Sequence, residues 1–275
     1  MKPARFAYAA PETLDQAAAL LAEHGDAARI MAGGQSLAPL LNMRLATPEM
    51  VIDISRIDAL RRIERKDEAI EVGAAVTQAE LQAWPELGTA QPLLARMLPF
   101  IGHYQTRQRG TVCGSLAHAD PSAELPLALA VLDGEVVLRR GDRERRVKAA
   151  AFQTGLLSTA LEPDEIVVAA RFPLAKAGAR VAFREVSQRH GDFAIVALAA
   201  IGMKDGVRLG VGGIADRPTV RALPWLDGTA LDDALNAFAW ALGGSDDPHA
   251  SARYRRELVR RIGRAVVEET RDALA

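Results

Sequence analysis

The sequence predicts an α+β chain of two regions that meet near residue 175. In the first region, short apolar strand-like runs alternate with amphipathic helices. Pro173–Gly178 is the most linker-like segment, and beyond it the pattern changes to three extended runs and a closing helix. We therefore expect a first domain over residues 1–175, with subdomains of about 1–55 and 56–175, and a second over 176–275.

The first predicted elements are a helix, a strand and a second helix. The helix covers Pro11–Gly25, because Thr13 and Gln16 have the spacing of a capping box and the final glycine can end it. The strand Ala28–Ala32 is apolar and short. A double glycine breaks it, and Ser36 is placed to cap the helix that follows.

Further short elements complete the first region. Strands are expected at Val51–Ile54 and Ile70–Gly73, and Thr77 and Glu80 have capping-box spacing before a short helix. Apolar runs predict two more helices, at Leu93–Ile101 and Leu125–Leu132, and a turn after the second predicts a strand at Glu135–Leu138. The stretch Arg139–Lys148 is rich in arginine with interleaved acids, which predicts a solvated hairpin rather than a nucleic-acid patch. A further strand is expected at Glu165–Phe172.

The second region combines three strands and a helix. The strands are Arg180–Glu185, Phe193–Met203 and Val207–Gly213, and Asp205 with the following glycine joins the last two in hairpin spacing. The final helix carries one apolar stripe at a spacing of four residues. The stripe consists of Tyr254, Leu258, Ile262 and Val266.

Composition excludes several classes of function. The formal net charge of −1 gives no general attraction for nucleic acid or anionic lipid. Cys113 is the single cysteine, so the chain alone cannot build a disulfide framework or a thiolate-rich metal site. The N-terminus does not resemble a signal peptide, and no apolar run is long enough to span a bilayer. We expect a cytoplasmic protein.

Two glycine-containing segments carry the candidate chemistry. In the first segment, Ala32–Leu37, glycines allow a sharp turn and a close approach to a ligand, and the helix start favours a phosphate. The second segment, Arg109–Glu124, adds hydroxyl groups that can donate to phosphate and a carboxylate that can accept. Ordinary turns with capping Ser and Thr would give the same residues. Together the segments suit a long ligand with a central pyrophosphate, although neither a G-x-G-x-x-G nor a Walker motif is present.

These segments also carry a resemblance to a known family. AGGQSL, RGTVCGSLAHADPSAE, LEPDEI at Leu161–Ile166 and FREVSQRHGDFAIV at Phe183–Val196 occur in an order that resembles the medium, FAD-binding subunit of the xanthine oxidase and carbon monoxide dehydrogenase family. The resemblance covers nearly the whole chain. It implies an FAD-binding domain of the vanillyl-alcohol-oxidase (PCMH) type, followed by a small C-terminal α+β domain with a three-stranded sheet and helices.

The resemblance also implies which residues lie at the cofactor. Two loops would enclose the FAD pyrophosphate, an acidic residue would bind the cofactor, and a cation and an aromatic residue would lie near the flavin ring. Cys113 stands where the family usually has glycine, so a positive φ there would strain the chain. The implied FAD-binding residues are Ala32, Gly33, Gly34, Gln35, Ser36, Leu37, Gly110, Thr111, Cys113, Gly114, Ser115, Ala117, Asp120, Glu124, Leu161, Arg184 and Phe193.

The function implied by the resemblance is electron transfer within an oxidoreductase. A large subunit would hold the molybdopterin cofactor, a small subunit two [2Fe-2S] clusters, and this chain FAD, as a dimer of heterotrimers. Electrons would pass from the clusters through FAD to an external acceptor, with no catalytic residue or metal ligand on this chain.

Three alternatives stay open from the residues alone. Gly34 to Ala38 resembles a nucleophile elbow, which would make Ser36 the nucleophile of a hydrolase, but too little chain precedes it to supply an oxyanion loop. His103, His118 and Asp120 could bind a metal by residue type, without an established spacing. A flavin-binding assembly module has the same sequence features as an electron-transfer subunit.

Overall fold

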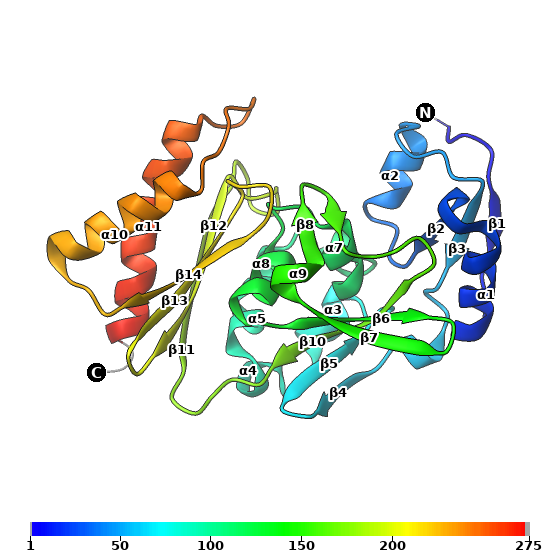
Figure 1. Ribbon diagram of the computed structural model, residues 1–275, viewed down its shortest axis with the longest axis horizontal. Helices are drawn as coiled ribbons and strands as arrows, with labels where there is room; N and C mark the ends of the chain where they lie inside the picture. The colour runs from blue at the N-terminus through cyan, green and yellow to red at the C-terminus, as the bar shows by residue number, and fades with distance from the viewer. Residues whose placement is uncertain (1, 273–275) are drawn as a thin grey trace.

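The computed structural model describes residues 2–272 and confirms the α+β fold class (Figure 1). Along its longest axis, an N-terminal sheet, a central sheet and a C-terminal sheet follow one another. The N-terminal sheet is parallel, in the order β1-β3-β2. Its strands are β1 (Ala7–Ala9), β2 (Ala28–Met31) and β3 (Met50–Asp53), the first of which the sequence did not predict.

Two helices belong to this N-terminal unit. α1 (Leu14–His24) begins at the predicted capping box, in which the Thr13 hydroxyl oxygen accepts from Gln16 N at 3.2 Å. α2 (Leu37–Asn42) begins after Ser36, but the Ser36 side chain makes no capping hydrogen bond, so this part of the prediction was wrong. The backbone at Ser36 is already helical, whereas a capping side chain needs an extended backbone at this position.

The central sheet is antiparallel, and its middle strand comes last in the sequence. The strand order is β4-β5-β10-β6-β7, so that β10 (Ile166–Pro173) pairs with both β5 and β6. The expected hairpin at Arg139–Lys148 is present, as part of β6 and β7. The remaining strands are β4 (Ile63–Lys66), β5 (Ala69–Gly73), β6 (Glu135–Arg140) and β7 (Arg143–Lys148), with a small hairpin β8 (Gln153–Gly155) and β9 (Ser158–Thr159).

Short helices surround the central sheet. The capping box of Thr77 and Glu80 is present at the start of α3. Every residue of α8 is buried, as its apolar sequence predicts. The helices are α3 (Gln78–Ala83), α4 (Leu87–Ala90), α5 (Pro92–Met97), α6 (Tyr104–Arg107), α7 (Val112–His118), α8 (Glu124–Val131) and α9 (Ala149–Phe152), with 3₁₀ turns at Gly25–Ala27, Asp58–Leu60 and Leu98–Phe100.

The C-terminal sheet has four antiparallel strands, one more than expected. The three predicted strands appear as β11 (Arg180–Val186), β12 (Val196–Met203) and β13 (Gly206–Gly212), and β14 (Thr219–Pro224) adds the fourth at an edge. No residue of β14 is fully buried, and prolines lie before it and at its end. Such an edge strand lacks the buried alternation on which the sequence prediction relied.

The C-terminal sheet lies between two layers of helices (Figure 1). On one face, β11 contacts α5 and β13 contacts α8, and this face belongs to the same buried core as the central sheet. On the other face lie α10 (Gly228–Ala241) and α11 (Ala252–Asp272), with a separate core. Because neighbouring residues of a strand point to opposite faces, this arrangement decides which side chains of β11 face the central unit. Within residues 2–272, none of the helices combines the length and apolar character needed to cross a membrane.

Candidate functional site

The two glycine-containing segments lie against each other, although they are far apart in the sequence. A Cβ atom placed on Gly33 would be only 2.0 Å from the carbonyl oxygen of Arg109 and 2.8 Å from the Cα atom of Gly110. A side chain at this position would overlap backbone atoms, which cannot move aside as a flexible side chain can. The absence of a side chain at Gly33 therefore allows the two segments to meet.

The first segment presents a row of free backbone donors. No acceptor within residues 2–272 takes a hydrogen bond from the N–H groups of Gly33 through Leu37. Gly34 turns the chain with a φ of 71°, and the Gln35 side chain donates back to Gly33 O at 3.2 Å. Successive unpaired N–H groups in a turn form a concave site that favours an anion.

The second segment presents small side chains toward solvent and apolar ones toward the core. The Thr111 hydroxyl oxygen accepts from Gly114 N at 3.1 Å and so caps α7, which is the structural role that hydroxyl residues often have. Gly114 is exposed and Ser115 and Ala117 are partly exposed, whereas the other face of α7 is buried. A ligand could therefore approach this helix closely over its small residues.

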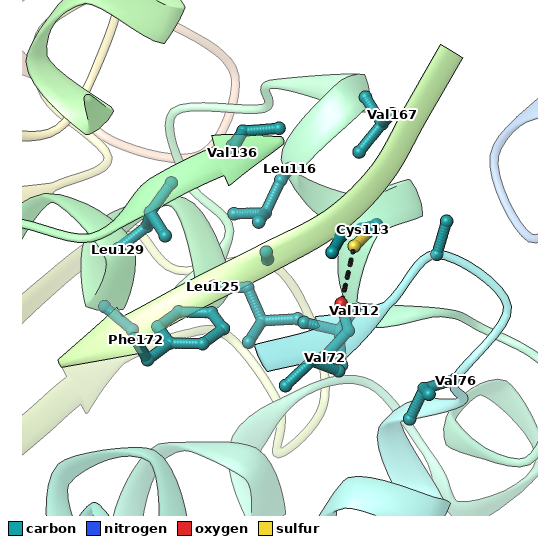
Figure 2. Close-up of a cluster of buried hydrophobic side chains, with 14 of the residues drawn as sticks. Val72, Val76, Val112, Cys113, Leu116, Leu125, Leu129, Val136, Val167 and Phe172 are labelled. Atoms are coloured by element: carbon teal, nitrogen blue, oxygen red, sulfur yellow. Dashed lines mark hydrogen bonds between the residues drawn. The ribbon is translucent and has the colours of Figure 1, made fainter. Parts of the chain in front are cut away.

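Cys113 does not point toward that face. Its thiol is buried and donates to the backbone oxygen of Val72 at 3.5 Å, as Figure 2 shows. Cys113 is not among the residues with positive φ, so the strain that the replacement of glycine suggested is absent. Its side chain belongs to the core, and only its backbone is available to a ligand.

The burial of Cys113 predicts an unreactive thiol. Loss of water raises the pKa of this thiol to about 12, so it stays protonated near neutral pH, and the protonated form is a poor nucleophile. We expect the native chain not to react with a thiol reagent such as dithionitrobenzoate. After unfolding in guanidinium, the chain should release one equivalent of thionitrobenzoate. Rapid labelling of the native chain would contradict the buried position.

Two acids at the end of the second segment have different surroundings. Asp120 Oδ1 accepts from Ser122 N at 2.8 Å, which stabilises the turn that leads into α8. Glu124, the first residue of α8, is only 4% exposed. Burial, together with the charge of Asp120, raises the pKa of Glu124 to about 7. Asp120 thus has a structural role, and Glu124 is the unusual group.

The sequence did not single out Glu185, which the structure brings to Glu124. Glu185 lies in β11, and its carboxyl group lies close enough to that of Glu124 for each acid to affect the other. The neighbouring Arg184, which the resemblance assigned to the flavin, points to the opposite face of the sheet, where its Nη2 lies 3.3 Å from Glu269 Oε2 of α11. The alternation of β11 could have indicated that only one of the two residues faces the second segment.

Phe193 and Leu161, the other two residues that the resemblance assigned to the flavin, lie outside the two glycine-containing segments. A Cβ atom on Gly191 would be 2.8 Å from Gly102 O, so the turn before Phe193 packs on the chain just ahead of the second segment. Phe193 is 61% exposed, and its ring is therefore accessible to a ligand. Leu161 packs against the core at the end of the small hairpin. Within residues 2–272, no group of three or more potential metal ligands occurs.

Comparisons with known proteins identify the family. Residues 4–175 match the FAD-binding domain in molybdopterin dehydrogenase. The 6-hydroxypseudooxynicotine dehydrogenase complex subunit alpha of Paenarthrobacter nicotinovorans is 36% identical over 94% of this chain and 92% of its own length. The carbon monoxide dehydrogenase medium chain of Hydrogenophaga pseudoflava is 35% identical over 75% of this chain and 72% of its own.

Chains in two solved enzyme structures have the same fold as this chain. Quinoline 2-oxidoreductase from Pseudomonas putida 86 contains a chain that superimposes with a TM-score of 0.93 at 30% identity, over 100% of both chains. The carbon monoxide dehydrogenase of Hydrogenophaga pseudoflava gives the same TM-score at 29% identity, again over 100% of both chains. The chain therefore belongs to the family of FAD-binding domains of molybdopterin dehydrogenases.

Proposed function

We propose that this chain is the FAD-binding, electron-transfer subunit of a molybdenum-containing hydroxylase or dehydrogenase. It would take electrons from the [2Fe-2S] clusters of a partner and pass them through FAD to an external acceptor. The observation that carries the proposal is the contact of Gly33 with Arg109 and Gly110, which brings the row of free N–H groups against the chain that leads into α7. FAD, when bound, supplies the redox chemistry of its flavin.

The residues of the two segments fit FAD. The free N–H groups from Gly33 to Leu37 are suitable donors to a pyrophosphate, and the hydroxyl of Ser115 can add a further donor. Glu124 supplies an acidic group for the cofactor, and the exposed ring of Phe193 can lie near a flavin. Arg184 would have to leave Glu269 to reach the cofactor, so we place it outside the binding site in this conformation.

The names of the relatives support the partners that we propose for this chain. These include a nicotine 6-hydroxylase medium subunit and carbon monoxide dehydrogenase medium chains, which are named as parts of multi-subunit enzymes. We propose a large subunit with the molybdopterin cofactor and a small subunit with two [2Fe-2S] clusters, assembled as a dimer of heterotrimers. We also propose a first domain over residues 1–175, a second over 176–275, and a cytoplasmic location consistent with the single reduced cysteine.

The absorption spectrum of the purified full chain tests the cofactor. We expect the two visible bands of an oxidised flavin and, after denaturation, release of FAD rather than FMN. A colourless chain that also takes up no added FAD would refute the proposal and reopen the hydrolase that uses Ser36. The dehydrogenase relatives do not favour that alternative.

Reduction of the flavin by a partner separates an electron-transfer subunit from an assembly module. In the purified complex, substrate of the molybdenum subunit should bleach the flavin bands in the absence of an external acceptor, and the acceptor should restore them. A flavin that stays oxidised while the iron–sulfur absorption is bleached would favour the assembly module.

A further inference from the structure

The buried pair of Glu124 and Glu185 has no role in the function proposed so far. The two side chains come from the start of α8 and from β11, so they connect the end of the second segment to the C-terminal sheet. Glu124 is 4% exposed, and Glu185 Oε2 is buried without a hydrogen-bond partner in residues 2–272. The two acids interact, and ionised carboxylates only accept hydrogen bonds, so a hydrogen bond between these groups would require a proton.

The surroundings do not neutralise a second negative charge at the pair. Arg107 acts on Glu124 through its charge but donates its hydrogen bonds to the oxygens of Pro99, Ile101, Gly102 and Gln82. Asp120 adds a further negative charge near Glu124. Other cations near these elements have partners elsewhere: Arg96 of α5 and Arg184 of β11 bind Glu269, and Arg208 of β13 binds the far end of α8. The remaining charged or titratable side chains on α7 and β11 are Cys113, His118 and Arg180.

We propose that Glu185 is a positioning residue for Glu124, and that the two carboxyl groups share one proton. The shared proton fixes the Glu124 carboxyl group at the end of the second segment and leaves an oxygen of the pair free to accept from the cofactor. This inference rests on the proposed FAD binding, because Glu124 acts on the cofactor and Glu185 acts through Glu124. It also joins the cofactor site to the C-terminal sheet.

The pair has a definite pH dependence. Burial is the largest cause that raises the pKa of Glu124 to about 7 and that of Glu185 to about 8, from an ordinary value of 4.5. Folding therefore takes up protons at pH values between the ordinary 4.5 and the raised values of about 7 and about 8. The stability associated with the pair is complete below pH 4.5 and decreases as the pH rises through 7 and 8.

The shared proton is tested first by unfolding in urea at a series of pH values, on the full chain freed of FAD. Between about pH 5 and pH 9, the folding equilibrium constant of the wild type should fall by at least about tenfold more than that of Glu185→Gln, whose amide cannot ionise. Glu269→Gln, which alters an acid near the other face of β11, is the matched control and should keep the wild-type dependence. Equal pH dependence of wild type and Glu185→Gln would overturn the shared proton.

The positioning role is tested by FAD titration of the same proteins, followed by flavin fluorescence. We expect Glu185→Ala to weaken FAD binding at neutral pH by about tenfold or more, the loss of a hydrogen-bonded position at the site, and Glu185→Gln to restore most of it. Equal affinity in all three proteins would overturn the positioning role, even where the pH dependence of unfolding is as expected. Absence of FAD binding in the folded wild type would instead refute the proposed function, and with it the positioning role, and the unfolding data alone would then decide the shared proton.

Discussion

Gly33→Ala is expected to abolish the retention of FAD. The added methyl group would meet the backbone oxygen of Arg109 at 2.0 Å, so one of the two segments must move away from the other. Overpacking typically costs about 1–3 kcal/mol, and a backbone contact belongs at the upper end of that range. A shift that separates the segments would also move the free N–H groups away from the second segment. We therefore expect the variant to lose FAD during gel filtration.

Gly88→Ala is the control for this substitution. Gly88 lies in α4, and a Cβ atom there would have no neighbour within 4 Å. Alanine in a helix is favoured over glycine by up to about 1 kcal/mol, so the control should retain FAD and be slightly more stable in urea. Full retention of FAD by Gly33→Ala would show that the contact between the segments does not form the cofactor site.

Arg171→Met is expected to cause the largest loss of stability in the central sheet. Arg171 is 4% exposed and lies in β10, the middle strand. Its guanidinium group binds Glu71 of β5, donates to the oxygen of Lys66 at 3.2 Å, and lies 3.8 Å from Glu135 of β6. Removal would leave Glu71 and Glu135 with only Lys66 and Lys148 as cation partners. Loss of one partner of a buried ion pair costs about 3–5 kcal/mol, and we expect the lower end because these acids are partly exposed.

Urea unfolding near neutral pH measures this effect. The matched control is Arg146→Met, which removes a 51% exposed arginine of β7 that lies 3.8 Å from Asp67. Exposed ion pairs contribute about 0–1 kcal/mol, so the control should remain close to the wild type. A loss below about 1 kcal/mol for Arg171→Met would indicate that the acids are well solvated without their partner.

Local signals in the sequence predicted the elements that depend on local interactions. Both capping boxes occur as predicted, because Thr13 and Thr77 need only a partner three residues away. The hairpin at Asp205 also depends on adjacent residues alone. Other features depend on pairing between distant segments, which no periodicity in the sequence encodes. These are the position of β10 between β5 and β6 and the presence of β14.

In the candidate site, too, local sequence predicted some residues, whereas others depend on how distant elements pack. Ala32–Leu37 and Arg109–Glu124 were recognisable from their own residues, and the structure brings them together at Gly33. Glu185 was missed because its significance comes from the burial of Glu124, which lies in another element. Arg184 was assigned to the flavin from the resemblance, but the face to which it points depends on the packing of β11 between α5 and α11.

The contact between Gly33 and Arg109 also sets the order in which the site can be completed while the chain is being synthesised. All three strands of the N-terminal sheet are complete by Asp53, so the first segment can take its place early. Its opposite wall emerges only with Arg109, and Glu185 emerges later still. A ribosome-bound chain that ends before β11 would therefore hold both glycine-containing segments but lack Glu185, so the site proposed above would be complete only after β11 has been synthesised.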